Sequence, residues 1–336
     1  MILNVAILGF GYWGPNLVRN FAKIDNCNIL YIVDKDNDRL NIAKSMYPNT
    51  QCINNALIAI RDKTVDAIIV ALPVSKHYKY AKLALEHNKH ILVEKPCTNS
   101  KNKFEKLVSL AKNKNLSLLI DYTFLYTSAV QKIKKLIDSN IIGDILFFDA
   151  QRMNLGTFRN DVNVIWDLAV HDISIMKYLI KQMPVSVIAT GIAHTKNNIE
   201  DMAYLSFKFK TNQIAHINCS WNFPFKNKKI FIGGSKKTIV YDDIEPTEKI
   251  KVYDKGYKFN NNMNNREIFL VDYRMGDIFI PKLSQEEALQ NVCNDFLSSI
   301  NKKNSPLTNS HFALQISSIL SACSKSLLAK GKEISI

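Results

Sequence analysis

The first 121 residues alternate short apolar runs with amphipathic segments, and this alternation constrains the fold more than any other feature. Strands that alternate with helices of about 10–15 residues form βαβ units and a parallel sheet. The apolar runs that we expect as strands are residues 5–8, 28–33, 65–71, 90–93 and 116–120. The sequence therefore predicts a doubly wound α/β domain of the Rossmann type over residues 1–121.

From residue 122 onward, strands no longer alternate with helices. After a helix expected at 127–138, strand-like runs follow one another at 145–153, 185–194, 202–210, 213–222, 228–234 and 237–241. This order predicts a mixed or antiparallel sheet in an α+β domain. Helices are expected at 285–300 and 309–330. We assign residues 122–336 to this second domain and expect it to bind substrate and to mediate oligomerisation.

The net charge of +14 is spread evenly along the chain. Residues 1–121 hold 17 basic and 10 acidic side chains and residues 122–336 hold 27 and 20, so each part carries +7. A nucleic-acid-binding protein concentrates such charge in a patch or a tail. We therefore expect no nucleic-acid partner.

Other features of the composition narrow the class of protein further. No run approaches the ~20 apolar residues of a membrane span, and the N-terminal run lacks the basic region of a signal peptide. The six cysteines are scattered without CxxC or zinc-ligand spacing. We expect no metal site, no membrane insertion and a reducing, cytoplasmic location.

A glycine-rich motif follows the first expected strand and opens a helix, which is the context that a dinucleotide site requires. Gly9 permits the tight turn, Gly11 lets the backbone approach a pyrophosphate, and Gly14 allows close packing of helix on strand. Asp34 ends the second strand and can accept hydrogen bonds from both ribose hydroxyls, which favours NAD over NADP. The expected cofactor contacts here are Gly9, Phe10, Gly11, Tyr12, Trp13, Gly14, Asp34 and Lys35.

Glu94-Lys95-Pro96 follows the strand expected at 90–93, and Leu72-Pro73 with His77 follows the strand expected at 65–71. Together with the glycine motif, these residues resemble the Gfo/Idh/MocA oxidoreductase family, whose members are NAD(P)-dependent sugar and cyclitol dehydrogenases. The resemblance covers essentially the whole chain. It implies cofactor contacts from Leu72, Pro73, His77, Glu94 and Lys95, with Glu94 orienting the lysine. The Lys95–Pro96 bond is left open as cis or trans.

The same resemblance implies a catalytic role for Lys95. A partly desolvated lysine beside the positive nicotinamide ring can take a proton from an alcohol as hydride leaves the carbon. Asp167 and His171 are four residues apart on one expected helix face, and relatives with this spacing turn both toward the substrate. Whether Lys95 or His171 is the base stays open, because the two could titrate as a coupled pair. Asp172 is expected to support the helix start.

The segment 152–174 resembles the branch of the family that acts on nucleotide-linked sugars, UDP-N-acetylglucosamine 3-dehydrogenases in particular. Arg152 and Arg159 are expected to bind a diphosphate, since guanidinium forks suit phosphate oxygens. Asp121-Tyr122 stands where relatives read Gly-His, which puts the sugar specificity in question. The residues expected to bind substrate are Tyr122, Arg152, Asn154, Arg159, Asn163, Trp166, Asp167 and His171.

The resemblance implies an NAD-dependent oxidation of the C3 hydroxyl of a UDP-N-acetylhexosamine, with UDP-GlcNAc as the expected substrate. The 3-keto product would feed an aminotransferase in amino-sugar synthesis for lipid A or surface polysaccharide. A homodimer or homotetramer is expected, as in relatives. One alternative is a dehydrogenase of myo-inositol, a free sugar or a UDP-sugar uronate. Another is a non-catalytic NAD-sensing regulator, against which the intact set of Lys95, Asp167 and His171 argues.

Overall fold

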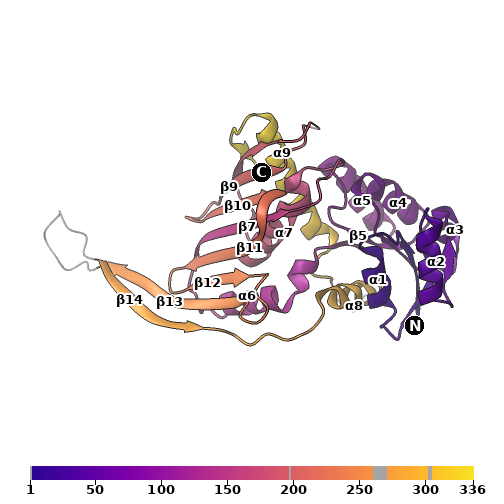
Figure 1. Ribbon diagram of the computed structural model, residues 1–336, viewed down its shortest axis with the longest axis horizontal. Coiled ribbons are helices and arrows are strands. Elements are labelled where there is room, and N and C mark those ends of the chain that lie inside the picture. The colour runs from indigo at the N-terminus through magenta and orange to yellow at the C-terminus, as the bar shows by residue number, and fades with distance from the viewer. Residues whose placement is uncertain (1, 197, 260–270, 302–304) are drawn as a thin grey trace. The chain divides into compact units, whose positions relative to one another are not determined.

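The computed structural model describes residues 2–196, 198–259, 271–301 and 305–336 (Figure 1). The chain forms two compact units, and neither is continuous in sequence. The first comprises Met1–Tyr126, Asn160–Val162 and Glu286–Ser321, and the second Thr127–Arg159, Asn163–Gln285 and Ala322–Ile336. The first boundary thus lies close to the expected one at residue 121, but a C-terminal segment returns to the first unit.

The first unit contains a six-stranded parallel sheet, which confirms the predicted fold class. Its order is β3-β2-β1-β4-β5-β6, the arrangement of dinucleotide-binding folds. Its central strands are almost wholly buried, as expected where helices cover both faces of a parallel sheet. The strands are β1 (Leu3–Leu8), β2 (Cys27–Val33), β3 (Gln51–Ile53), β4 (Ala67–Val70), β5 (His90–Glu94) and β6 (Leu118–Asp121).

Helices of the first unit begin where local side chains favour them. Asp36 caps one helix and Asn55 another, each accepting backbone N–H groups that have no partner within the helix. The short helix after Asn55 was not expected from the sequence. The helices are α1 (Gly14–Phe21), α2 (Asn37–Met46), α3 (Ala56–Arg61), α4 (Val74–Glu86), α5 (Lys101–Asn113) and the 3₁₀ turn η1 (Thr123–Tyr126).

Two late helices complete the first unit. α8 (Ala288–Ile300) packs on α1, where the rings of Phe21 and Phe296 meet edge to face at 6.5 Å. Residues up to Ser321 of α9 (Ser310–Leu328) also belong here. The hydroxyl of Tyr126 donates to Asp295 at 2.7 Å, tying η1 to α8. The C-terminal segment therefore stabilises the region that follows β6.

The second unit contains a nine-stranded sheet of order β14-β13-β12-β11-β7-β10-β9-β8-β15. Among its described strands only β7 and β10 pair in parallel, so the predicted mixed sheet is confirmed. The strands are β7 (Ile145–Leu155), β8 (Ser186–Ile192), β9 (Met202–Lys208), β10 (Ile214–Ser220), β11 (Asn222–Gly234), β12 (Thr238–Asp242), β13 (Ile250–Phe259), β14 (Val271–Phe279) and β15 (Ile334–Ser335). The β13–β14 pair was not expected.

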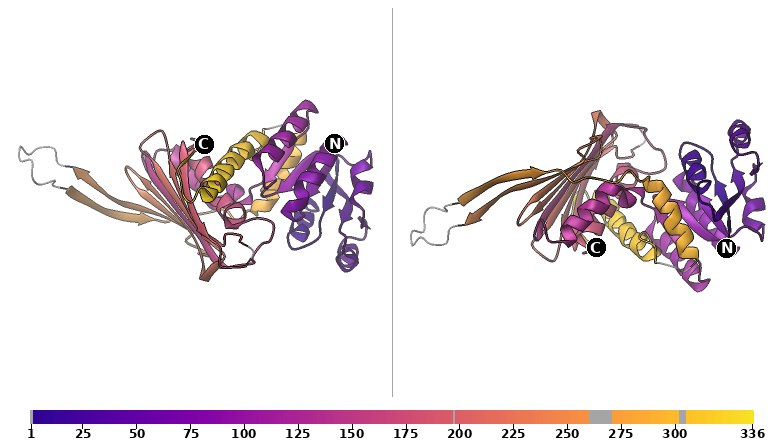
Figure 2. Two further views of the ribbon diagram at one scale, coloured as in Figure 1. Left: turned by 90° about the horizontal axis from the view of Figure 1, so that it is seen from above. Right: turned by 90° about the horizontal axis from the view of Figure 1, so that it is seen from below.

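One face of this sheet is covered by α6 (Ser128–Asp138) and α7 (Val170–Ile180), as both views of Figure 2 show. A π-helical turn, η2 (Ile165–Ala169), leads into α7. The burial of β7 alternates accordingly: Phe148, Ala150 and Arg152 are buried, whereas Phe147 is 40% exposed on the other face. In the described part of the chain, no helix is long and apolar enough to cross a membrane.

Candidate functional site

The glycine motif forms a tight turn between β1 and α1 that requires glycine at two positions. Gly9 has φ +103°, and a Cβ there would lie 2.3 Å from the carbonyl oxygen of Ala71. A Cβ on Gly14 would lie 2.1 Å from the carbonyl oxygen of Gly9. Trp13 precedes α1 without providing a side-chain cap, so the first N–H groups of the helix suit an anion. This turn fits the pyrophosphate of a dinucleotide.

Asp34 joins the end of β2 to the glycine motif. Its Oδ2 accepts the backbone N–H of Phe10 at 2.7 Å, and its Oδ1 accepts that of Asp36 at 3.0 Å. Nη1 of Arg39 lies 3.7 Å from Oδ2, while Lys35 points into solvent. The carboxylate is 7% exposed and keeps further lone pairs for ribose hydroxyls. Its position therefore fits the expected ribose contact.

The aromatic residues of the motif differ in exposure. Phe10 is buried at 4% exposure, whereas Tyr12 is 94% exposed and offers a ring face to a ligand. The indole nitrogen of Trp13 is buried and interacts with Asp121 at the end of β6. Phe10 therefore supports the turn, Tyr12 is free to contact a cofactor, and Trp13 connects the motif to a neighbouring strand.

The Lys95–Pro96 peptide is cis and directly follows β5. His77 holds this turn: its Nδ1 lies 2.9 Å from the carbonyl oxygen of Pro96 and its Nε2 lies 2.6 Å from that of Leu72. Burial lowers the pKa of His77. The imidazole thus links the end of β4 to the lysine turn, and Pro73 precedes the first turn of α4. His77 and Leu72 act on Lys95 through the backbone that they fix.

Two carboxyl groups end neighbouring strands beside Lys95. Glu94 of β5 pairs in register with Asp121 of β6. Asp121 is 1% exposed, and its Oδ1 accepts the hydroxyl of Thr123 at 2.6 Å. Burial, followed by the charge of Asp121, raises the pKa of Glu94 well above its usual range, and burial also raises the pKa of Asp121. Tyr122 points the other way and packs edge to face on Phe312 as a core residue, 3% exposed.

In the second unit, Asp167 lies in the π-helical turn η2. Its Oδ2 accepts the indole N–H of Trp221 at 3.0 Å, and Nε of Arg159 lies 3.8 Å from its Oδ1. Trp221 is 1% exposed and also touches Phe158, with ring centroids 5.9 Å apart. π-helical turns are frequent at functional sites. The contacts fix one oxygen of Asp167 and leave the half-exposed Arg159 beside the other.

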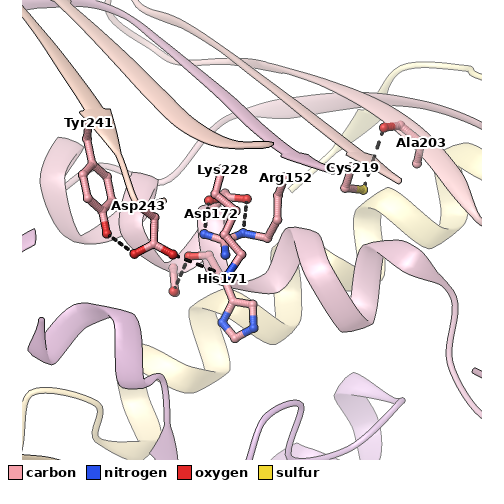
Figure 3. Close-up of polar contacts among 9 residues, drawn as sticks. Arg152, His171, Asp172, Ala203, Cys219, Lys228, Tyr241 and Asp243 are labelled. Carbon is pink, nitrogen blue, oxygen red and sulfur yellow. Dashed lines mark hydrogen bonds and ion pairs between the residues drawn. The ribbon is translucent and has the colours of Figure 1, made fainter. Parts of the chain in front are cut away.

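Arg152 takes a role that the sequence did not predict. Its Nε and Nη2 donate to the two carboxylate oxygens of Asp172, each at 2.8 Å, within the face covered by α7 (Figure 3). The Arg152 guanidinium, which was expected to bind a diphosphate, is thus hydrogen-bonded to Asp172 inside the second unit, because β7 directs this side chain toward α7. Asp172 lies in the first turn of α7 and does not cap the helix. Figure 3 shows the His171 ring pointing away from the strands.

Other predicted substrate residues shape the segment before α7. Asn163 Oδ1 accepts the backbone N–H of Trp166 at 3.3 Å, and its Nδ2 donates to Glu200 at 2.9 Å. Trp166 is buried and donates from Nε1 to Ser324 at 2.9 Å. Asn154 is half-buried near the end of β7. Asn163 and Trp166 therefore position η2, and only Arg159 of the predicted polar contacts on this segment is strongly exposed.

The structure brings the predicted residues together in two groups. The first unit gathers the glycine motif, Asp34 and the Lys95 turn at the carboxyl ends of its strands, where ligands bind in open α/β sheets. The second unit gathers Asp167, His171 and Arg159 around the start of α7. Sequence reasoning missed the contact of Trp221 with Asp167, although a buried indole N–H signals a need for an acceptor. Within the described residues, no group of three or more His, Cys, Asp or Glu residues could hold a metal ion.

Comparisons with known proteins agree with this division. Residues 3–122 match a model described as "Oxidoreductase family, NAD-binding Rossmann fold", and residues 130–240 match the GFO/IDH/MocA C-terminal domain. A 2,7-anhydro-N-acetylneuraminate hydratase from Escherichia coli K12 is 25% identical over 269 residues, covering 75% of this chain and 70% of the relative. A UDP-N-acetylglucosamine 3-dehydrogenase from Acidithiobacillus ferrooxidans is 25% identical over 220 residues, covering 65% and 67%.

Solved structures show the same fold. The UDP-N-acetylglucosamine 3-dehydrogenase of Acidithiobacillus ferrooxidans superposes with a TM-score of 0.80 at 20% identity, over 98% of this chain and 99% of that one. A levoglucosan dehydrogenase in complex with NADH superposes with a TM-score of 0.82 at 18% identity, over 100% and 99%. At these identities the structural likeness establishes the fold alone.

Proposed function

The chain belongs to the Gfo/Idh/MocA family of oxidoreductases, and from this premise we propose which sugar it oxidises. Its first unit is an NAD-binding Rossmann domain, and the protein is an NAD-dependent oxidoreductase of the sugar type. We propose that it oxidises the C3 hydroxyl of a UDP-N-acetylhexosamine, namely UDP-GlcNAc, to the 3-keto sugar. The product would suit a pyridoxal-dependent aminotransferase that makes a 3-amino sugar for lipid A or surface polysaccharide.

One observation carries the choice of substrate. A UDP-N-acetylglucosamine 3-dehydrogenase is found by both sequence and structure comparison, and its structure is covered almost completely. The exposed Arg159 beside Asp167 supports the proposal. A guanidinium next to the carboxylate that is proposed to bind substrate can donate to the oxygens of a diphosphate or to sugar hydroxyl groups. Arg152 does not support diphosphate binding, because its guanidinium donates to the carboxylate of Asp172.

The proposed chemistry assigns roles to this chain's own residues. Bound NAD supplies the hydride acceptor. Lys95 takes the proton of the C3 hydroxyl and stabilises the developing carbonyl oxygen. In the second unit, His171 and Asp167 bind hydroxyl groups of the sugar. Asp34 holds the ribose, the glycine motif holds the pyrophosphate, and His77 fixes the backbone of the lysine turn.

A second candidate is a dehydrogenase of a free sugar, a cyclitol such as myo-inositol, or a UDP-sugar uronate. This candidate is favoured by the burial of Arg152. Of the two arginines expected to bind a diphosphate, only Arg159 is exposed, whereas a diphosphate would be better bound by both. A non-catalytic NAD-sensing regulator is the remaining alternative, and it has no need for an acid–base set at the nicotinamide.

The test is NADH formation, followed by absorbance, with UDP-GlcNAc, UDP-GlcNAc uronate, dTDP-sugars, myo-inositol and free hexoses. Turnover of UDP-GlcNAc to a 3-keto product supports the leading proposal. Turnover confined to free sugars or cyclitols supports the second. Absence of turnover on the whole panel, together with salt-sensitive DNA binding, would favour a regulator.

We also propose the homodimer or homotetramer and the cytoplasmic location that the sequence suggests. The support for assembly is the face of the nine-stranded sheet opposite α6 and α7. There Phe147 and Ile214 are neighbours in register on β7 and β10, and both are exposed, as is Tyr204 on β9. A second copy of this chain would bury these apolar side chains, and sedimentation analysis would measure the assembly.

A further inference from the structure

We propose that Glu94 and Asp121 share one proton and act as a single acid pair of net charge −1 that positions and balances Lys95. The proposal rests on the proposed role of Lys95 as the group that takes the substrate proton. It explains why this chain carries an acid at position 121, where its relatives were expected to carry glycine. Both members are positioning residues, since they act on the substrate through the lysine.

The geometry of the sheet makes the two acids neighbours. β5 and β6 run parallel with Glu94 and Asp121 in register, and paired residues of adjacent strands project to the same side of a sheet. Asp121 is 1% exposed, and the Oε1 atom of Glu94 is buried although other parts of this residue reach solvent. Each of the two carboxyl groups acts on the pKa of the other.

The carboxyl oxygens of Glu94 and Asp121 have fewer hydrogen-bond donors than they can accept. Asp121 Oδ1 accepts the Thr123 hydroxyl, and the backbone of Lys95 donates to Glu94. Among the described residues, Glu94 Oε1 and Asp121 Oδ2 have no hydrogen-bond partner, and neither has the buried Trp13 Nε1, which acts on Asp121. Two buried carboxylates at one place repel each other, so one of them becomes protonated. An O–H on Glu94 that donates to Asp121 satisfies both oxygens.

The groups that face the pair favour this assignment. Lys95 follows Glu94, and its charge lowers the pKa of both acids without outweighing burial. The Trp13 indole and the Thr123 hydroxyl act on Asp121, so the charge is better stabilised there than on Glu94. From α8, Cys293 faces both acids; burial raises the pKa of its thiol well above the usual value, and it stays neutral.

The charge of the pair decides what Lys95 can do. Two ionised carboxylates would place two negative charges beside the lysine, one more than the ammonium formed in the step can balance. A neutral pair would leave the ammonium without a counter-charge after it has done so. With one shared proton, the substrate O–H bond breaks, an N–H bond forms on Lys95, and the pair balances the new positive charge. The proton count of the pair does not change during the step.

The first experiment needs no substrate. The protein is labelled with ¹³C at the carboxyl groups of Asp and Glu, and carboxyl resonances are followed against pH in the full chain without cofactor. We expect one carboxyl group to remain protonated at neutral pH, far above the usual range of about 4. In Glu94→Gln and Asp121→Asn the remaining acid lacks its acidic neighbour, so its resonance should titrate at lower pH although burial keeps its pKa raised. Asp25→Asn, a matched control at an exposed position, should leave the resonance unchanged.

The second experiment tests the net charge of the Glu94–Asp121 pair through the pH profile of kcat/KM. Each single substitution keeps one negative charge, so Glu94→Gln and Asp121→Asn should leave the acid-limb midpoint within about 0.3 pH units of the wild type. The double variant Glu94→Gln/Asp121→Asn removes the charge, and its midpoint should fall by about one unit or more. A purely structural role would lower the rate in all three variants without this pattern. The measured quantity is therefore the pH midpoint of the acid limb of kcat/KM and not the maximum rate.

The outcomes separate this proposal from the proposed function. If no carboxyl group stays protonated at neutral pH in the wild type, the shared proton is refuted whether or not the enzyme turns over UDP-GlcNAc. Single variants that shift the midpoint as far as the double variant would equally overturn it. If no sugar is oxidised but the high-pKa carboxyl resonance is present and titrates at lower pH in both single variants, the acid pair stands and the assigned reaction falls.

Discussion

Arg152 and Asp172 form a closed ion pair between β7 and α7. The arginine donates through Nε and Nη2 to separate carboxylate oxygens at 2.8 Å, and the two side chains are 3% and 1% exposed. Asp172 directly follows His171, whose ring points away from the strands (Figure 3). An arginine that the sequence suggests for substrate binding is therefore held in a buried ion pair one residue from a predicted catalytic residue.

Removing one partner of this pair should destabilise the second unit. Arg152→Met leaves the Asp172 carboxylate buried without its counter-ion, which typically costs about 3–5 kcal/mol of unfolding free energy. Urea unfolding followed by circular dichroism measures the loss. The double variant Arg152→Met/Asp172→Leu is the control and should recover much of it. If Arg152→Met is as stable as the wild type and only its KM for UDP-GlcNAc is raised, the result would instead support a role of Arg152 in binding the diphosphate.

Asp34→Ser should weaken NAD binding and reduce the preference for NAD over NADP. The substitution removes the acceptor of the Phe10 N–H and the negative charge that would repel a 2′-phosphate. Losing hydrogen bonds to a charged group costs about 1.5–3 kcal/mol, or tenfold or more in affinity. The half-exposed Arg39, 3.7 Å from Asp34, then becomes available to a phosphate. Fluorescence titration with both cofactors measures the ratio.

The control for this change is Asp25→Asn, at an exposed position before β2 and outside the contacts of Asp34 and Arg39. It should leave the cofactor ratio unchanged. An unaltered NAD/NADP ratio in Asp34→Ser would rule out the ribose contact.

Lys95→Met should lower turnover by about 10²–10⁴-fold, the usual contribution of a group that transfers a proton. Methionine keeps much of the side-chain volume but cannot accept a proton. NAD affinity should stay within a few-fold, because the glycine motif and Asp34 are untouched. Stopped-flow NADH formation and equilibrium NAD titration separate the two effects, with Lys76→Met on the exposed side of α4 as control. Equal loss of turnover and NAD binding would make the lysine structural.

The sequence predicted the fold where its signals are local. The β1 run, the glycine turn and Asp34 lie within one βαβ unit, so spacing alone located them. Arg152 and Tyr122 could not be placed in this way, because their roles depend on partners brought close by tertiary packing, Asp172 of α7 and Phe312 of α9. The β13 strand was missed because Lys and Gly interrupt its apolar alternation.

The Arg19–Glu287 contact between α1 and the start of α8 should make stability depend on acid pH. Nη1 and Nη2 of Arg19 donate to Glu287 at 2.8 and 2.5 Å, and Nδ2 of Asn20 donates at 2.9 Å. The hydrogen bond from Arg19, then that from Asn20, lowers the pKa of Glu287 from 4.5 to about 2. A folded-state pKa below the unfolded value stabilises the fold above about pH 4.5, and this contribution disappears as pH falls through about 2.

Glu287→Gln tests this sign. The wild type should exceed the variant in unfolding free energy at neutral pH by up to about 1 kcal/mol, a modest value because the glutamate side chain is 39% exposed and screened by water. The difference should shrink steadily as pH falls from about 4.5 toward 2, and added salt should reduce it at neutral pH. Glu286→Gln, one residue earlier and exposed, is the matched control. Urea midpoints measured across this pH range decide the matter, since a difference that grows on acidification would mean that Glu287 destabilises the fold.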